Sequence, residues 1–344
     1  MLSMNFKLIL TIIGMFLISI LKAQDINFSQ FNELPLLRNP ALAGIYKGDI
    51  LATSALRNQW ASVTVPYFSQ ALGTEMKFSP SENSDNYLAF GLQMTNDVAG
   101  DSKLGKTQLL PLIAFHKSIS SQKDMYLSIG CMWGLVQQRF DPTKLKFDDQ
   151  FINGAYSASN PTQQTFSNTE LRYGDGTVGL TFSSTVGENI NYYIGAAIFH
   201  ITSPKVAFNK QNDIILNRKY VINAGFSAPT SDFDKFILYA DYFTQGGNNQ
   251  FQGGFIYKHD LIQGDEESLS LSGGMFLRWN DAVIPLLKLD YYKLGVGLTY
   301  DINISKLHLA SQMKGGFELT LSFKSFLNIK NSSANKTRCP VNIN

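Results

Sequence analysis

Between Ser268 and Trp279 the chain alternates between apolar residues and residues that are mostly polar or small. Successive side chains of a β-strand point to opposite faces, so one face of this segment is almost wholly apolar and ends in Trp279, while the other ends in Arg278. A strand with one wet face fits an antiparallel sheet of a soluble protein and also the wall of a membrane barrel. The remaining sequence has to decide between the two.

Composition favours the barrel. Charged residues make up 16% of the 344 residues and aromatic residues 12%, whereas about 25% of a soluble globular chain is charged. Beyond the N-terminal segment, no stretch approaches the ~18 consecutive apolar residues of a membrane helix. Few charges and many aromatics without a spanning helix are typical of strands that alternate between lipid and lumen. A large secreted β-sandwich is the alternative, and the net charge of +2 indicates no nucleic-acid partner.

The N-terminal segment predicts export. Lys7 precedes the apolar run 8–21, and a small residue stands at the end of 1–23, which we interpret as a cleaved signal peptide. No cysteine lies near the expected cleavage point, so no lipid anchor is expected. Cys131 within a predicted strand and Cys339 near the end of the chain indicate neither a disulfide nor a metal site, and we interpret Cys131 as a small wall residue.

The mature chain divides into three parts. Residues 24–47 do not alternate, and Pro35, Pro40 and Gly44 interrupt regular structure, so they form an irregular arm that is either periplasmic or plugs the lumen. Residues 48–323 form the barrel. Residues 324–344 form a polar tail, most simply a flexible periplasmic extension.

Alternation and turn residues predict about fourteen strands within residues 48–323. Lengths near ten residues suit strands that cross a bilayer at a tilt. The predicted strands are Gly48–Trp60, Val65–Pro80, Asn86–Asp97, Lys106–Ser118, Asp124–Arg139, Gly176–Thr185, Asn191–His200, Arg218–Ala228, Phe233–Phe243, Asn248–Asp260, Ser268–Trp279, Ala282–Asp290, Leu294–Asp301 and Gly316–Phe323. The predicted fold is therefore an all-β, transmembrane, antiparallel and monomeric β-barrel.

The lengths of the connections support this fold. Bacterial barrels have short periplasmic turns and longer extracellular loops. If the first strand runs outward, the outer connections include the three longest, which are Asp141–Asp175, Ile201–Asn217 and Ile302–Lys314. Ile119–Lys123, Gly187–Ile190 and Pro229–Asp232 are then short inner turns. A soluble sandwich has no reason to sort its loops in this way.

Charged residues of the predicted strands fall on the face opposite to the apolar one. Ionisable groups at membrane depth are costly unless they face a lumen or pair with each other. These residues either form a structural network or line a lumen that holds a plug or an incoming chain. They are Arg57, Asp241, Lys258, Arg278, Lys288, Asp290, Asp301 and Glu318, with Asp281 beside them at the rim.

No motif predicts catalysis or a cofactor. The four histidines are scattered without metal-ligand spacing, and no nucleophile elbow or phosphate-binding glycine loop is present. Asp148 and Asp149, in the longest loop, lack the oxygen spacing of a calcium site and are interpreted as a solvated acidic turn. We therefore expect neither enzyme activity nor a bound cofactor or metal.

Eight short motifs, in order along nearly the whole mature chain, together carry a family resemblance. They are Phe28-Ser29-Gln30-Phe31, Asn39-Pro40-Ala41-Leu42-Ala43-Gly44, Arg57-Asn58-Gln59-Trp60, Leu171-Arg172-Tyr173-Gly174-Asp175, Phe199-His200-Ile201-Thr202-Ser203-Pro204, Arg278-Trp279-Asn280-Asp281-Ala282, Tyr300-Asp301-Ile302 with Ser305-Lys306-Leu307, and Gly316-Phe317-Glu318-Leu319. With these motifs the chain resembles the PorP/SprF family of outer-membrane proteins of the Bacteroidetes type IX secretion system.

The resemblance implies an outer-membrane barrel that works with other components of this secretion machinery. It implies binding of a large secreted protein through that protein's C-terminal secretion domain, for export or for retention at the surface, as for gliding-motility adhesins. A core-apparatus role and a passive or hydrophobic-ligand channel stay open as alternatives.

The candidate functional residues fall into three groups. The expected partner contacts of the outer loops are Arg172, Tyr173, Asp175, Pro204, Asp148 and Asp149. The expected lumen network comprises Arg57, Arg278, Asp281, Asp301, Glu318, Lys288 and Asp290. The arm motif comprises Phe28, Gln30, Asn39, Pro40 and Gly44.

Overall fold

The computed structural model describes residues 25–59, 65–80, 84–120, 124–152, 154–157, 159–187, 189–209, 213–264, 267–305 and 314–327. The expected signal peptide, Trp60, His308, Cys339 and the tail beyond residue 327 lie outside these described residues. Among the described residues, no helix is long and apolar enough to cross a membrane.

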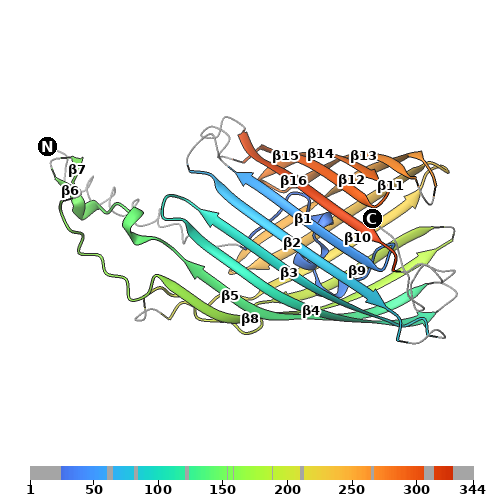
Figure 1. The fold of residues 1–344 in the computed structure, drawn as a ribbon, viewed down its shortest axis with the longest axis horizontal. Coiled ribbons are helices and arrows are strands. Elements are labelled where there is room, and N and C mark those ends of the chain that lie inside the picture. Colours follow the sequence, from blue (N-terminus) through green and yellow to red (C-terminus); the bar gives the residue numbers. More distant parts are fainter. Residues whose placement is uncertain are drawn as a thin grey trace, which may run out of the picture.

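Fourteen antiparallel strands close into a barrel, as the alternation predicts (Figure 1). Strands pair in the order of the sequence, and β1 pairs with β16 to close the sheet, with Arg57 opposite Glu318. The barrel strands are β1 (Ile50–Gln59), β2 (Tyr67–Phe78), β3 (Tyr87–Ala99), β4 (Leu104–Ser120), β5 (Met125–Arg139), β8 (Glu170–Val186), β9 (Ile190–Phe199), β10 (Lys219–Pro229), β11 (Asp234–Gln245), β12 (Asn248–Ile262), β13 (Leu269–Arg278), β14 (Ala282–Tyr291), β15 (Leu294–Asn303) and β16 (Lys314–Ser325).

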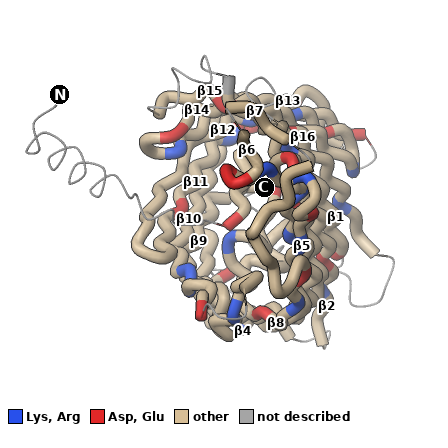
Figure 2. Tube along the Cα trace, turned by 90° about the vertical axis from the view of Figure 1, so that its left-hand side faces the viewer, with Lys and Arg blue, Asp and Glu red and all other residues tan. Residues whose placement is uncertain are grey.

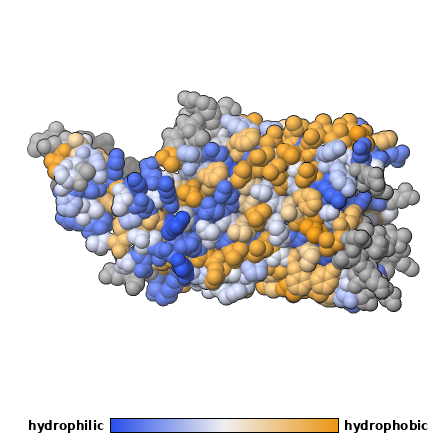
Figure 3. Space-filling model, in the orientation of Figure 1, coloured by the Kyte–Doolittle hydropathy of each residue, from blue (hydrophilic) through white to orange (hydrophobic). Residues whose placement is uncertain are grey.

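The side chains of the strands point to the lumen or to the outside as the alternation predicts. In β13, Ser272 and Phe276 are buried toward the lumen, whereas Leu271 and Met275 are exposed on the outside. Trp279, just beyond the outer end of β13, is 59% exposed. Apolar side chains cover much of the outer wall in Figure 3, as expected of a surface that faces lipid.

The three longest connections lie at one end of the barrel, at 140–169, 200–218 and 304–313. We call this the outer end and the opposite one the inner end. The connection 140–169 projects beyond the wall (Figure 1) and contains the 3-10 turns η4 (Pro142–Lys144) and η5 (Asp148–Gln150). It also holds a small hairpin made of β6 (Phe151–Ile152) and β7 (Ala155–Tyr156).

One predicted boundary is wrong. The loop expected to run to Asp175 ends before Glu170, because β8 begins there and pairs with β5 from Arg139 onward. Arg172, Tyr173 and Asp175 therefore lie on a strand. Polar residues at the outer end of this strand interrupt the apolar alternation, while the backbone hydrogen bonds of the ladder continue.

The N-terminal arm lies inside the barrel (Figure 1). It contains the 3-10 turns η1 (Phe31–Glu33), η2 (Pro35–Leu37) and η3 (Pro40–Leu42). Phe31 packs against Phe276 and Tyr239 of the wall, with ring centroids 4.9 and 6.3 Å apart. The arm thus supplies the centre of the hydrophobic core within the lumen.

A charge placed on the outer wall should destabilise the protein according to its depth. Leu287, midway along β14, and Tyr291, at its end, are 53% and 54% exposed. We expect Leu287→Arg to lower the free energy of unfolding by about 2–4 kcal/mol and Tyr291→Arg by about 0–1 kcal/mol, because charge costs most at the bilayer midplane. Denaturant unfolding in lipid vesicles measures both; equal losses would contradict a lipid-facing wall.

Candidate functional site

The candidate site consists of the arm-filled lumen and the outer end above it. Near the start of the arm, two backbone N–H groups donate to one buried carboxylate. Ser29 N donates to Glu318 Oε2 at 2.7 Å and Gln30 N to Glu318 Oε1 at 2.8 Å. The Ser29 hydroxyl donates to Asp301 Oδ1 at 2.5 Å, and Thr320 donates to the Gln30 side chain at 2.7 Å. Wall carboxylates therefore satisfy arm backbone groups that water cannot reach.

Asp301 also joins two buried arginines. Its Oδ2 lies 2.7 Å from Arg57 Nη2 and 3.1 Å from Arg278 Nη1. Arg278 also pairs with the half-exposed Asp281 at 2.8 Å, and Arg57 donates to the carbonyl of Asn27. Because an unpaired buried charge is strongly destabilising, each member depends on the others. Five residues of the expected lumen network, Arg57, Arg278, Asp281, Asp301 and Glu318, therefore contact one another or the arm.

A second buried pair lies deeper in the lumen. Arg38 of the arm forms a bidentate ion pair with Asp241, with Nε–Oδ2 at 2.8 Å and Nη2–Oδ1 at 2.5 Å. Its guanidinium lies 5.2–5.7 Å from the ring centroids of Phe31, Tyr193 and Tyr239. A bidentate pair with aromatic neighbours fixes both the position and the orientation of the arm.

The turn η3 is seated on the wall by Asn39. Its side-chain oxygen accepts from Ala41 N at 2.8 Å, and its Nδ2 donates to Leu180 O at 3.0 Å and Thr181 Oγ1 at 3.1 Å. Pro40 lies so close to Gly130 that a Cβ there would be 2.5 Å from the Pro40 carbonyl. The wall therefore has a glycine where the backbone of the arm lies against it.

Near the inner end, the arm is held by charges of two further wall regions. Gly44, with φ +78°, donates its N–H to Glu75 Oε2 at 2.8 Å. Lys77 Nζ donates to the carbonyls of Gly44, at 3.2 Å, and of Tyr46. Glu33 accepts from Lys288 at 2.8 Å. The five residues of the predicted arm motif are all buried: Phe28, Gln30, Asn39, Pro40 and Gly44.

At the outer end, His200 links the arm to the wall. Its Nε2 lies 2.5 Å from Asp25 and its Nδ1 2.5 Å from Asp175, while Lys106 pairs with Asp25 at 2.9 Å. His200 lies one residue beyond β9, and burial alone would lower its pKa. The hydrogen bonds and negative charges of Asp175 and Asp25 outweigh burial and raise the pKa of His200 to about 9. The ring is therefore charged at neutral pH.

The candidate partner contacts divide in the structure. Asp175 is 3% exposed and lies on the lumen side of the wall, so its expected role as an outer contact is wrong. Its carboxylate instead lies 2.5 Å from His200 Nδ1. Tyr173 accepts a hydrogen bond from Gln138 at 3.0 Å. Arg172 is exposed and pairs with Glu170 at 2.5 Å.

The remaining three candidates lie in the outer connections. Pro204 is half-buried, and its carbonyl accepts from Leu216 N at 2.9 Å. Asp149 accepts from Gln163 N at 2.7 Å, so it orders the projecting connection, while Asp148 beside it is exposed.

Sequence patterns do not single out Arg38, Lys77 or Lys106 as arm anchors. The alternation along a strand can place a charged wall residue on the lumen face. It does not identify the arm residue that contacts this wall residue. Charged residues of both signs lie intermingled over the wall and loops when the barrel is viewed from the outer end (Figure 2). Within the described part of the chain, no group of three His, Cys, Asp or Glu residues could hold a metal ion.

A closed sheet with an apolar outer face and a polar, arm-filled lumen defines a membrane β-barrel of the outer-membrane type. The chain belongs to the PorP/SprF family, since the family model described as "Type IX secretion system membrane protein PorP/SprF" matches residues 20–323. The predicted family membership is confirmed. No curated protein matches the chain.

Solved barrels of similar overall fold include transporters and channels. The Ralstonia pickettii toluene transporter TbuX is 10% identical, with a TM-score of 0.48, over 86% of this chain and 94% of that one. A Pseudomonas aeruginosa FadL homologue is 8% identical, with a TM-score of 0.47, over 83% and 92%. A mutant of the TodX monoaromatic hydrocarbon channel is 11% identical, with a TM-score of 0.46, over 86% and 94%.

Enlarging Gly130 should displace the arm. In Gly130→Val the new side chain meets the backbone of Pro40 and Ala41, so we expect the arm to leave its seat and the barrel to conduct ions. Planar-bilayer recordings measure the conductance, and limited proteolysis measures access to the arm. Gly273→Val is the control, because a Cβ there meets nothing within 4 Å. A closed, protease-resistant Gly130→Val protein would contradict this account of the arm.

Removing the central carboxylate should destabilise the protein strongly. Asp301→Ala leaves Arg57 and Arg278 without their shared partner, and breaking a buried pair in this way costs about 3–5 kcal/mol. Denaturant unfolding measures the loss. Asp213→Ala, which removes an exposed partner of Lys205, should change the stability little. Equal effects of the two substitutions would show that the buried network does not hold the fold.

Proposed function

We propose that this protein binds a large secreted type IX cargo protein at its outer end and supports the export or surface retention of that cargo. The observation that carries the proposal is the connection 140–169, which extends beyond the barrel (Figure 1). This connection has exposed apolar side chains. Family membership supports the secretion context. Surface adhesins, including those of gliding motility, are one class of cargo that such a barrel would serve.

The tip of this segment has the features of a docking site. Phe151, Ile152 and Tyr156 of the β6–β7 hairpin are 48%, 51% and 39% exposed. Exposed aromatic residues are enriched at the centres of protein interfaces. A hairpin of two short strands also leaves backbone edges to which a partner strand can add. The proposed cargo contact is therefore this hairpin with the exposed Asp148, which lies just before it in the chain, while the exposed Arg172 lies on β8 near the base of the projection.

Aromatic contacts hold the projecting segment in place. Phe140 packs edge-on against Phe166 and against Phe208 of the neighbouring connection, with centroids 5.1 and 4.8 Å apart. Phe147 lies 6.0 Å from Phe166. An anchored segment loses less conformational entropy on binding than a free loop would, which favours recognition at its tip.

The filled lumen disfavours a passive channel. Ion pairs and hydrogen bonds join the arm to wall strands from its outer to its inner end. We therefore propose a monomeric, non-catalytic scaffold for secretion, with no cofactor and with outer-membrane lipid and other secretion components as its surroundings. Deletion of the gene distinguishes a cargo-specific role from a role in the core apparatus. Loss of one secreted cargo indicates the first role, and loss of every secreted cargo indicates the second.

The hairpin can be tested directly. We expect Phe151→Ser/Ile152→Ser/Tyr156→Ser to lower co-purification of the secreted protein by about tenfold or more, because the central apolar contacts of an interface dominate its affinity. Pull-down of the full-length barrel followed by mass spectrometry measures the recovery.

The matched control is Phe233→Ser/Leu261→Ser/Ile262→Ser, which removes similarly exposed apolar side chains at the inner end. Undiminished recovery with the hairpin variant, or equal losses with both, would refute cargo binding at this site.

A further inference from the structure

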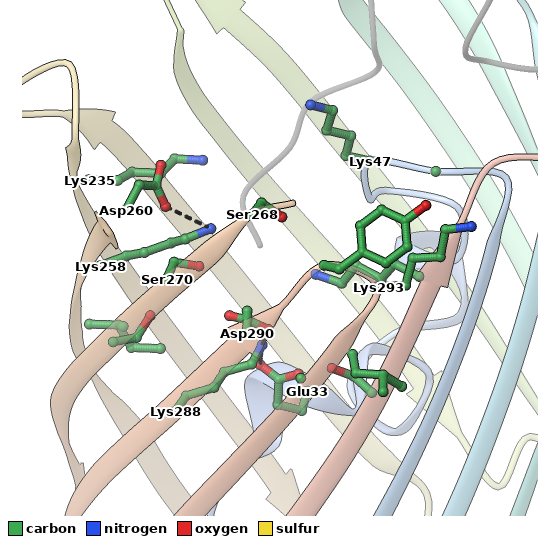
Figure 4. Close-up of a pocket in the computed structure, with 18 of the residues that line it drawn as sticks. Glu33, Lys47, Lys235, Lys258, Asp260, Ser268, Ser270, Lys288, Asp290 and Lys293 are labelled. Atoms are coloured by element: carbon green, nitrogen blue, oxygen red, sulfur yellow. Dashed lines mark hydrogen bonds and ion pairs between the residues drawn. The ribbon is translucent and has the colours of Figure 1, made fainter. Parts of the chain in front are cut away.

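A cavity of about 800 Å³ opens at the inner end of the barrel (Figure 4). It lies between the inner ends of β11–β16, residues 47–48 just before β1, and the turn η1 of the arm. The short connections 263–268 and 292–293 border it, so it faces the side opposite to the proposed cargo hairpin. Its volume is within the usual range of ligand sites, roughly 300–1,000 Å³.

The cavity is strongly basic. Six lysines and three carboxylates line it, an excess of three positive charges that exceeds the net charge of +2 of the whole chain. The lysines are Lys47, Lys235, Lys258, Lys288, Lys293 and Lys324, and the acidic residues are Glu33, Asp260 and Asp290. A concave surface with charges of one dominant sign attracts ligands of the opposite sign.

Two of the lysines form ion pairs with all three carboxylates. Lys288 lies 2.8 Å from Glu33 and 3.3 Å from Asp290, and Lys258 lies 3.6 Å from Asp260. Among the described residues, no carboxylate lies within ion-pair distance of the three lysines Lys47, Lys293 and Lys324. Lys258 and Lys288 together with the three carboxylates carry one net negative charge, so the other four lysines, Lys47, Lys235, Lys293 and Lys324, bring the cavity to three positive charges.

The positive charge is spread over the cavity. Figure 4 shows Lys47 and Lys293 on one side and Lys235 and Lys258 on the other. Serine hydroxyls of the lining add hydrogen-bonding groups; they belong to Ser268, Ser270, Ser272, Ser322 and Ser325. Separated cations in a cavity of this size match several anionic groups held along an extended ligand better than they match one compact ion.

We propose that this cavity binds an acidic peptide segment of a periplasmic protein, with Lys47, Lys293 and Lys324 pairing with successive Asp or Glu side chains. The segment that follows in the chain, 328–344, is an unsuitable occupant, because it contains Lys330, Lys336 and Arg338 and no Asp or Glu. The proposal does not depend on cargo binding, which we place at the other end of the barrel.

Fluorescence anisotropy with the full-length protein in detergent tests the proposal, with labelled hexaglutamate as the probe and hexaglutamine as its uncharged counterpart. We expect saturable binding of hexaglutamate only, weakening as salt is added because the contacts are ionic. Lys47→Gln/Lys293→Gln/Lys324→Gln should weaken it by about tenfold or more, since three partners of the ligand are lost.

The control variant Lys103→Gln/Lys144→Gln/Lys146→Gln removes the same charge from exposed residues at the outer end and should bind as the wild type does. Heat-modified gel mobility verifies that both variants are folded. Equal affinity of the two variants would overturn the proposal. Full displacement of hexaglutamate by equimolar pyrophosphate would also overturn it, and would assign the cavity to a small anion.

Discussion

The structure depends on matching buried charges across the lumen. Closing a sheet into a barrel removes its edges, but it turns the polar face of every strand inward, where charged groups require partners. Asp301 forms ion pairs with both Arg57 and Arg278, and Glu318 accepts hydrogen bonds from two N–H groups of the arm. The arm and the wall are therefore one folding unit, since neither satisfies its buried polar groups alone.

Because the arm is bound to the wall inside the lumen, the two ends of the molecule are separate surfaces. With the lumen filled, the outer and inner ends offer different chemistry to partners. The outer end presents an apolar, aromatic hairpin on a supported projection, whereas the inner end presents a basic cavity beneath the arm. The proposed cargo hairpin and the proposed peptide cavity therefore lie at opposite ends of the barrel.

Sequence reasoning predicted the strands and their faces well, because alternation within ten residues reports directly on a half-buried strand. Ser272 and Leu271 show their opposite environments by position alone. The same reasoning failed at Asp175, since polar residues of a strand beyond the bilayer resemble a loop. It also left Arg38 unnoticed, because Asp241, its partner, lies 203 residues away in the chain.

The sequence by itself determined the barrel class, an approximate number of strands and the lumen-facing charges, which all follow from local periodicity and turn residues. Only the tertiary structure decided that the arm fills the lumen, that Asp301 joins two arginines, and that six lysines meet at the inner end. Those facts depend on contacts between distant segments. Closure of the sheet creates these contacts, and no local pattern encodes them.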